Sequence, residues 1–235
     1  DKTTTDAILQ RPLPPSEGFR ENQFVNVGEL VNRGLEVGLT AQLLRLRNVQ
    51  WESRINFNTL HNELTDLGGL APFGTLNRFT EGYQAGSFVA KRIRRIDEAA
   101  SRVTVADTFE VVGNVLPTFE GAWQNTLTLF GNLRFAALID TKQDYYVYNN
   151  THFWHDTQNI RSLRRLDPTF FSARERLRRF GDLTPGRPAF VQENGGTTTV
   201  NEVREAYIQS GDFVRFRELS ATFTVPQRLT RRVGG

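Results

Sequence analysis

Hydrophobic and polar residues alternate without interruption along the segment VQWESRINFN, residues 49–58. The odd positions hold Val, Trp, Ser, Ile and Phe, and the even positions hold Gln, Glu, Arg, Asn and Asn. Successive side chains of a β-strand point to opposite faces of the sheet, so this segment predicts a strand with one apolar and one polar face. The apolar face lies either against a protein core or against lipid, and alternation alone fits both.

Four further segments show the same alternation. They cover residues 35–42, 119–129, 133–139 and 218–225, and Pro226 stops the last of them because proline cannot donate to a strand ladder. At 7 to 11 residues, the five alternating segments are long compared with the usual ~5 to 6 of a strand in a soluble domain.

The connections between these strands differ sharply in length. Short turns are predicted at Leu44 to Asn48 and at Gly131-Asn132, whereas 59–118 and 141–211 are very long for loops within a compact domain. When the strands run alternately up and down, both short turns fall on one side and both long segments on the other. This asymmetry is typical of outer-membrane β-barrels.

Two short helices are predicted inside the second long segment. Ser172 and Glu175 form a capping-box pattern ahead of Leu177 and Phe180, and Gly181 supplies a stop. A similar Thr199 and Glu202 pair precedes Val203 and Tyr207.

The composition narrows the class of protein. The chain has 235 residues with no Cys and no Met, and it begins at Asp1, so we expect it to be part of a longer translation product without disulfides or thiolate metal sites. We find no signal peptide and no apolar run near the ~18 to 20 residues of a spanning helix. A membrane protein with this sequence would have to be a β-barrel.

The basic residues of the chain are almost all arginine. They cluster at 91–95 and 161–179 and could bind phosphates, but no recognition-helix pattern or RNA-binding aromatic motif accompanies them. We therefore expect solvated loops and no nucleic-acid partner.

Candidate chemistry is sparse. His152, His155 and Asp156 resemble a metal cluster, but a His pair with one carboxylate fixes no coordination geometry without further ligands. No nucleophile motif, Gly-rich phosphate loop or zinc-protease motif occurs. We expect no catalytic residue, no metal, no cofactor and no enzymatic activity.

The best candidates for ligand contact are aromatic residues near the start of the second long segment. Aromatic faces stack on sugar rings and pack on peptide side chains, but such residues also form belts at membrane interfaces. Both interpretations stay open for Tyr145, Tyr146, Tyr148, Phe153 and Trp154.

Five short motifs occur in a fixed order along the chain. The first is NVGELVNRGLEV at 26–37, in which Asn26, Gly28, Asn32, Gly34 and Glu36 match N-x-G-x-x-x-N-[KR]-G-x-E. EGYQAGSF at 81–88, VGNVLPTF at 112–119 and YNN at 148–150 follow, and the last runs from GDFVRFREL at 211–219 to Pro226. The last motif includes Gly211, Phe213 and Arg215, with Phe216 where the pattern has Leu. In this order, the motifs resemble those of SusC/RagA-type TonB-dependent outer-membrane transporters.

The resemblance implies a fold and a setting for the chain. The expected fold class is all-β: a partial, open section of an antiparallel transmembrane β-barrel, with long extracellular loops that contain one or two short helices. Residues 1–235 would be part of the C-terminal barrel domain, with the plug domain absent. Val49, Trp51, Ile55 and Phe57 would then face lipid, and Gln50, Glu52, Arg54, Asn56 and Asn58 would face the lumen.

The resemblance also implies a function in the bacterial outer membrane, namely energised uptake of oligosaccharides or peptides. The implied partners are outer-membrane lipid, the remainder of the barrel and plug, TonB, a SusD-like surface lipoprotein and the cargo. The alternative is a soluble β-sandwich or calyx that binds carbohydrate, in which the apolar faces would pack in a core.

Overall fold

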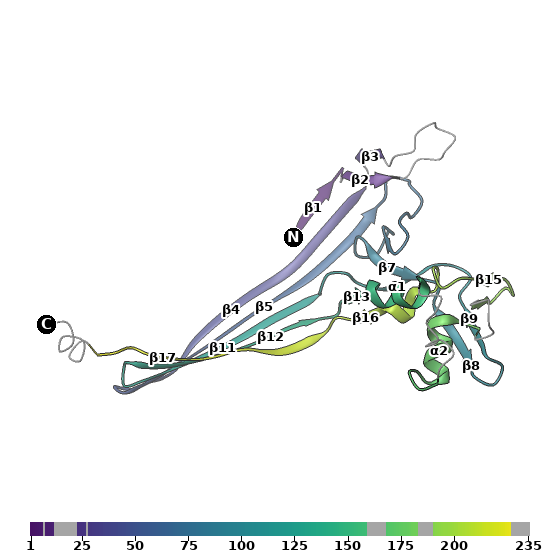
Figure 1. Ribbon diagram of the computed structural model, residues 1–235. Helices are drawn as coiled ribbons and strands as arrows, with labels where there is room; N and C mark the ends of the chain where they lie inside the picture. Colours follow the sequence, from purple (N-terminus) through teal and green to yellow (C-terminus); the bar gives the residue numbers. More distant parts are fainter. Residues whose placement is uncertain (7, 12–22, 27, 159–167, 183–189, 227–235) are drawn as a thin grey trace. The chain divides into compact units, whose positions relative to one another are not determined.

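The computed structural model describes residues 1–6, 8–11, 23–26, 28–158, 168–182 and 190–226, and the chain divides into two compact units. Unit 1 comprises Asp1–Asn32, Asn62–Leu116 and Tyr145–Gly211, and unit 2 comprises Arg33–His61, Pro117–Asp144 and Asp212–Gly235. The elements in chain order (Figure 1) are β1 (Lys2–Thr5), β2 (Ile8–Arg11), β3 (Gln23–Asn26), β4 (Glu29–Arg45), β5 (Val49–Asp66), β6 (Asn77–Arg78), β7 (Ser87–Ala90), β8 (Ile93–Asp97), β9 (Arg102–Val105), β10 (Glu110–Gly113), β11 (Phe119–Leu129), β12 (Leu133–Gln143), β13 (Tyr146–Tyr148), α1 (Asn150–Gln158), α2 (Ala173–Phe180), β14 (Phe190–Gln192), β15 (Thr197–Thr198), the 3-10 helix η3 (Arg204–Tyr207), β16 (Ile208–Ser210) and β17 (Phe213–Phe223).

Unit 2 is built from long antiparallel strands. The order β1-β4-β5-β11-β12-β17 describes one open sheet, and the last five strands of this order supply unit 2. β4 and β5 reach 17 and 18 residues, which is longer than the alternation alone predicts. The predicted open section of an antiparallel barrel sheet is confirmed.

The two short turns occur where the sequence predicts them. β4 ends at Arg45 and β5 begins at Val49, while β11 ends at Leu129 and β12 begins at Leu133. Gly131 adopts a φ of 73°, a left-handed conformation that costs glycine little. The register fixed by these turns runs without a shift from Leu129↔Val49 to Phe119↔Thr59 on one side of β11. All side chains of a given parity therefore share one face.

A bulge in β17 explains an irregular spacing in the last motif. Ile139 pairs with Phe216, but the next residue back, Leu138, pairs with Glu218, so Arg217 is the extra residue. Because of this insertion, Phe216 and Leu219 lie on the same face although they are three positions apart. Both are exposed, at 59% and 71%.

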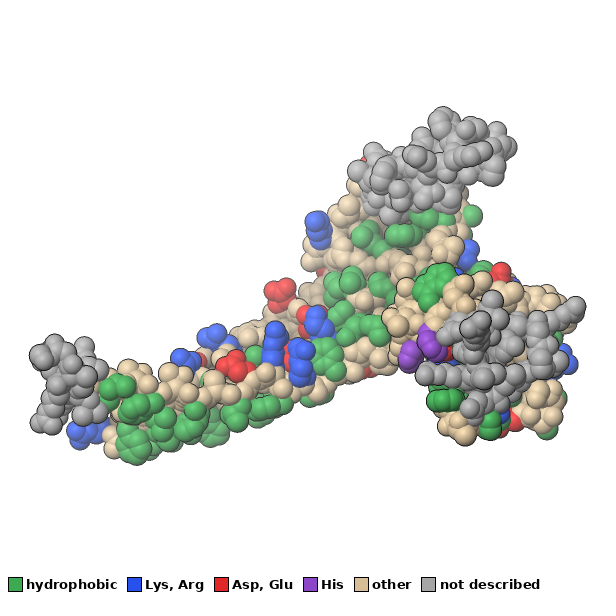
Figure 2. Space-filling view, viewed as in Figure 1, with side chains coloured by type: hydrophobic (Ala, Val, Ile, Leu, Met, Phe, Trp, Pro, Cys, Tyr) green, Lys and Arg blue, Asp and Glu red, His purple; other side chains and the backbone are tan. Residues whose placement is uncertain are grey.

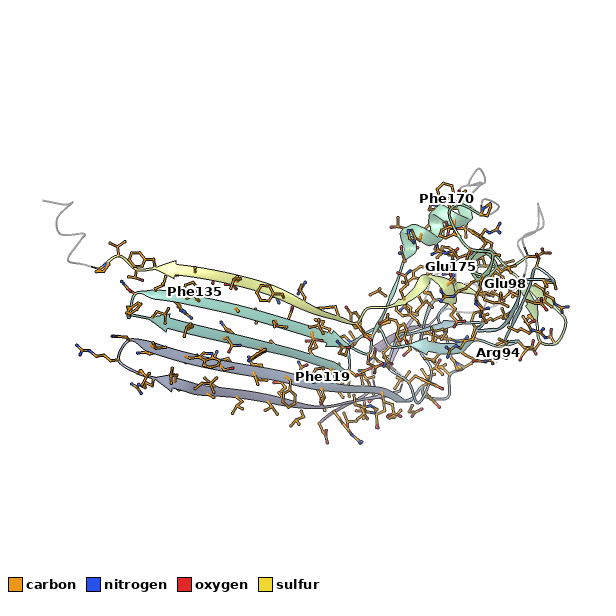
Figure 3. All side chains as sticks on the ribbon, turned by 90° about the horizontal axis from the view of Figure 1, so that it is seen from below. Arg94, Glu98, Phe119, Phe135, Phe170 and Glu175 are labelled. Carbon is orange, nitrogen blue, oxygen red and sulfur yellow. The ribbon has the colours of Figure 1, made fainter. Side chains whose placement is uncertain are left out.

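The two faces of unit 2 differ in chemistry. Hydrophobic side chains follow the long strands as a band, with charged side chains above it (Figure 2). Phe119 and Phe135 project from neighbouring strands of this sheet (Figure 3), and the ring of Phe119 stacks on Phe57 at 6.2 Å between centroids. Trp51 and Trp123 are 41% and 46% exposed, so they are not buried between two sheets as a β-sandwich would require.

Unit 1 contains the long connections, which are folded rather than formless. Its described strands include a three-stranded sheet β10-β7-β6, a four-stranded sheet β15-β14-β9-β8 and the pairs β13-β16 and β2-β3, while β1 pairs with the start of β4. β14 runs parallel to β9. Residues from both long segments thus share one hydrogen-bonded sheet.

Three hydrophobic clusters form the interior of unit 1. The first joins Leu177 of α2 to four residues on strands and loops, namely Val103, Val105, Phe190 and Val203. The second groups Phe88, Ala90 and Ile208, and the third groups Phe153, Ala206 and Tyr207. Burial of the larger side chains in these clusters contributes about 1.5–3 kcal/mol each. This burial stabilises a folded structure in segments that are very long for loops.

The helices of unit 1 agree with the sequence only in part. α2 is capped as predicted, since the backbone N–H of Glu175 donates to Ser172 Oγ at 3.2 Å and the N–H of Gly181 donates to the carbonyl of Leu177 at 2.8 Å. The second prediction, a helix begun by Thr199, is corrected to the four-residue η3, which starts at Arg204. The carboxylate of Glu202 accepts from Thr198 Oγ1 and pairs with Lys91 instead of completing a capping box.

Helix α1 was not predicted. Asn149 caps it, because its Oδ1 accepts a hydrogen bond from the backbone N–H of His152 at 3.1 Å. No helix in the described part of the chain is long and apolar enough to cross a membrane.

Candidate functional site

A charged cluster on the polar face of unit 2 is the most organised polar feature of its sheet. Asp140 on β12 accepts hydrogen bonds from Arg215 Nε at 3.0 Å and from Arg215 Nη2 at 2.7 Å, a fork-shaped pair. Arg217 donates to the same carboxylate at 3.1 Å. Arg215 pairs with Asp140 in the register and Arg217 is the bulge residue of β17, and both reach the one carboxylate.

A second ion pair extends this cluster along the sheet. Lys142 and Glu120 lie opposite each other on β12 and β11, and their charged atoms are 2.6 Å apart. The two ion pairs border a hollow of about 770 Å³ that is also lined by Glu36, Asn56 and Asn58. Sugars and peptides are rich in hydroxyl, amide and charged groups, and this surface offers both donors and acceptors to them.

Two polar residues of the apolar face, one on β5 and one on β11, are each matched to a tryptophan. Ser53 and Asn125 lie opposite each other in the register of β5 and β11. The indole N–H of Trp51 donates to Asn125 Oδ1 at 3.1 Å, and that of Trp123 donates to Ser53 Oγ at 2.9 Å. This reciprocal pairing satisfies both indole donors, so the polar residues remain compatible with an apolar environment.

Several residues of the first motif have clear structural roles. Gly28 has a φ of 85°, and a Cβ there would lie 2.1 Å from the carbonyl oxygen of Asp66. At Gly34 a Cβ would lie 2.5 Å from the carbonyl oxygen of Thr59. Both glycines therefore allow a close approach of β4 to β5. Glu36 lines the hollow on the polar face.

Asn32 contributes hydrogen bonds within unit 1. Its Oδ1 accepts from Asn62 Nδ2 at 2.6 Å, and Asn62 Oδ1 accepts from the backbone N–H of Ala85 at 3.0 Å. The first motif is thereby connected to the second. Asn26 lies in β3, but its side chain is outside the described residues.

The last motif also combines close packing with charge pairing. A Cβ at Gly211 would lie 2.5 Å from the Tyr145 ring, so the glycine makes room for that aromatic residue. Phe213 and Arg215 open β17, and the Arg215 guanidinium lies 5.0 Å from the centre of the Phe213 ring. Pro226 follows the end of the strand.

Gln84 connects two motifs, although sequence reasoning did not select it. Its side chain is 4% exposed, and its Oε1 accepts from the backbone N–H groups of Val115 and Leu116 at 2.9 and 2.7 Å. Its Nε2 donates to the carbonyl of Leu116. The only sequence signal for this role was the position of Gln84 inside the second motif.

The five aromatic candidates do not gather on one surface. Phe153 is buried, and Tyr146 and Tyr148 pack against the hydrophobic clusters of unit 1. Trp154 is half exposed, and Tyr145 packs against Gly211. Ligand contact stays a prediction for this group, and Trp154 has the most exposed ring surface for it.

The histidine-containing segment forms a salt-bridge network. Asp156 Oδ2 accepts from Arg179 at 3.1 Å and from the Tyr207 hydroxyl at 3.2 Å, and His155 Nδ1 lies 3.2 Å from Asp156 Oδ1. Burial raises the pKa of the Tyr207 hydroxyl, and the Asp156 charge adds to this effect. Among the described residues no group of three or more His, Cys, Asp or Glu side chains is arranged to hold a metal ion.

The arginine cluster at 91–95 is neutralised by nearby carboxylates. The segment forms the ion pairs Lys91–Glu202, Arg92–Glu205, Arg94–Glu110, Arg94–Glu193 and Arg95–Asp97. Within the second cluster, Arg161, Arg164 and Arg165 lie outside the described residues.

Gly28 provides a test of the close contact between β4 and β5. We expect Gly28→Ala to destabilise the protein by about 1–3 kcal/mol, because alanine at positive φ is strained and its Cβ would clash with Asp66. Gly69→Ala is the matched control, since Gly69 also has positive φ (77°) but has no atom within 4 Å of the added Cβ. Denaturant titration in lipid vesicles measures both, and equal losses would argue against a role for the contact.

Together these features define a class by fold: a section of a large antiparallel barrel sheet, with an apolar face, a polar charged face and folded loops. No family model matches the chain. The TonB-dependent receptor P26 from Formosa agariphila is 23% identical over 264 residues, which cover 96% of this chain and 25% of that protein. The TonB-dependent receptor P39 from the same organism is 35% identical over 74 residues, or 32% of this chain and 7% of that protein.

Solved structures show the same fold. The RagAB peptide transporter matches 97% of this chain and 26% of its own, with a TM-score of 0.71 and 19% identity. The RagAB peptide importer in the open-open state matches the same shares, with a TM-score of 0.67 and 20% identity. These matches confirm the resemblance to SusC/RagA-type TonB-dependent transporters. The chain spans about a quarter of the length of these relatives.

Proposed function

We propose that this chain is part of the C-terminal barrel domain of an outer-membrane transporter that takes up oligosaccharides or peptides with energy supplied through TonB. The observation that carries the proposal is the opposition of two faces on one sheet. Leu39, Ile55 and Trp123 are each 44–59% exposed on the apolar face, whereas the Asp140 cluster occupies the other.

The apolar face fits a hydrocarbon environment. Large side chains that are exposed on β4, β5, β11 and β17 would be costly in water as a continuous patch, and lipid removes this cost. The indole hydrogen bonds to Asn125 and Ser53 leave no unsatisfied donor on either tryptophan. Strand ladders supply the backbone hydrogen bonds that lipid cannot offer.

The polar face fits a water-filled passage for polar cargo. Asp140 accepts hydrogen bonds from both Arg215 and Arg217, so contacts within the sheet itself fix the positions of these side chains. A plug, TonB and a SusD-like lipoprotein are proposed partners. The similarity to the RagAB peptide transporter supports peptides as cargo, and oligosaccharides are the alternative.

Uptake by intact cells tests this function. Bacteria that express the full-length protein should accumulate fluorescent peptides or fluorescent oligosaccharides, and loss of TonB should reduce uptake to background. Comparison of the two cargo types identifies the substrate class. Uptake that is independent of TonB would contradict the proposal.

The Asp140 cluster should contribute to this uptake. Asp140→Asn preserves shape but removes the charge that holds Arg215 and Arg217, so we expect a several-fold lower uptake with normal amounts of protein in the membrane. Glu218→Gln is the control, because Glu218 pairs with Leu138 on the same face and takes no part in the cluster. An equal loss in both variants would show that only the overall charge of the face matters.

A further inference from the structure

A second cavity lies within unit 1, on one face of the sheet β10-β7-β6. Its volume is about 810 Å³. Arg78 pairs with Ser87, and Val89 pairs with Val111, so alternation places Arg78, Val89 and Val111 on the same face, which lines the cavity. The other face carries Phe88 and Ala90, which belong to a hydrophobic cluster of unit 1. The sheet thus separates a packed interior from the cavity.

Arg78 has unused hydrogen-bonding capacity in this cavity. One of its terminal nitrogens donates to the carbonyl of Pro72 at 3.2 Å, and its Nε is buried without a partner. Across the part of the chain that the structure describes, no carboxylate lies within ion-pair distance of Arg78. A charged donor in this state is costly, and an oxyanion would remove much of the cost.

The surroundings of Arg78 combine charge with aromatic surface. Its guanidinium lies 5.4 Å from the centre of the Phe109 ring, and Lys91 Nζ lies 5.8 Å from the same centre. Lys91 is neutralised by Glu202 at 2.7 Å, so Arg78 carries the uncompensated positive charge. Tyr83 also lines the cavity and is 48% exposed, which leaves ring surface for the body of a ligand.

Two acidic residues, Asp107 and Glu110, line the cavity, and Glu110 is paired with Arg94. Asp107 accepts a hydrogen bond at Oδ1 from the backbone N–H of Asn194 at 3.0 Å. Its charge opposes anion binding, so removal of that charge should strengthen binding. Asp107→Asn is therefore expected to change the affinity for an anion in the direction opposite to Arg78→Gln.

We infer that this cavity is a binding site for an organic oxyanion, a carboxylate or sulfate group carried by a sugar or a peptide, with Arg78 as the anion-binding residue. The residues that line this cavity belong to unit 1, whereas the Asp140 cluster belongs to unit 2. The inference goes beyond the proposed function, because binding to the cavity requires neither TonB nor transport.

Binding measurements on the purified full-length protein in detergent test this inference. The probes are trigalacturonate against maltotriose, and triglutamate against trialanine with both peptides acetylated and amidated at their ends, each measured by calorimetry. We expect the acidic member of at least one pair to bind and its neutral partner to bind much more weakly. The pair that responds shows whether the anion is carried by sugar or peptide. Equal binding of acidic and neutral probes, or no binding of either acid, overturns the inference.

Variants assign the effect to the cavity. Arg78→Gln should weaken binding of the acidic probe by about tenfold or more, since hydrogen bonds to charged groups are among the stronger ones. Arg78→Lys, which keeps the charge, should lose less, and Asp107→Asn should bind more tightly than wild type. Arg102→Gln on β9 removes an exposed arginine elsewhere in unit 1 and should bind as wild type. Thermal melting of each variant verifies its fold, and unchanged binding in a folded Arg78→Gln overturns the inference.

Discussion

Ile55→Arg is expected to destabilise the protein in lipid by about 2–4 kcal/mol, the cost of an arginine on the lipid face of a barrel near mid-membrane. Ile55 is 44% exposed on the apolar face and pairs with Trp123 in the register. Asn56→Arg changes the neighbouring residue on the polar face, where Asn56 borders the hollow, and should cost little. Denaturant titration of the full-length protein in lipid vesicles measures both variants.

Two conservative variants distinguish lipid from a protein core on this face. A close-packed core adds a cavity penalty to the loss of apolar surface when Ile55 is shortened, whereas lipid fills the gap. We therefore expect Ile55→Ala to lose mainly the transfer free energy of the removed methylene and methyl groups, and Ile55→Leu to lose almost nothing. A penalty for Asn56→Arg equal to that of Ile55→Arg would show that the face assigned to the lumen is not in water.

The alternation of the sequence predicted the sheet because strand side chains have a period of two. The register from Val49 to Thr59 preserves this period without a shift, so the apolar and polar faces follow directly from residue parity. The β17 bulge breaks the period, and parity alone would have placed Phe216 and Leu219 on opposite faces. Only the pairing with β12 shows which residue is the insertion.

The folded loops of unit 1 were less predictable. The strands β7, β9 and β14 are short, and one hydrophobic cluster of unit 1 joins residues as far apart in the sequence as Val103 and Phe190. Such contacts depend on pairings that no local pattern specifies. The sequence predicted α2 because its capping residues Ser172 and Gly181 are local signals. It did not predict α1, because the hydropathy and the aromatic residues of that segment are not typical of a helix.

In the candidate site, too, the sequence predicted the residues that carry a local signal and missed those that depend on long-range contacts. The motif glycines Gly28, Gly34 and Gly211 were selected from the sequence, and the structure gives each a close contact that excludes a side chain. Asp140 was not selected, because its partners come from β17, more than seventy residues later in the chain. Arg78 likewise shows no local signal, because its unused hydrogen-bonding capacity depends on which side chains surround it in the fold.

Asp156→Ala is expected to destabilise unit 1 by about 3 kcal/mol, because it removes one partner of a buried ion pair. The Asp156 carboxylate is 4% exposed and accepts hydrogen bonds from Arg179 and the Tyr207 hydroxyl. Arg179 would keep its bond to Glu175 at 2.7 Å but would lose its second anion. In the native protein burial lowers the pKa of Arg179, and the two carboxylates outweigh this effect, so that the pKa is raised. The Tyr207 hydroxyl would lose its acceptor.

Hydrogen exchange measured by mass spectrometry on the full-length protein localises this effect. Protection should fall in the peptides that contain α1, α2 and η3, since Asp156, Arg179 and Tyr207 come from these elements, and it should remain unchanged in β11 and β12. Asp156→Asn keeps an acceptor for Tyr207 and should lose less protection. Glu98→Ala is the control, because Glu98 and Arg174 form an exposed pair 3.6 Å apart that should contribute at most about 0.5 kcal/mol. If Asp156→Ala and Glu98→Ala gave the same exchange pattern, the buried network would not be what joins α1 and α2.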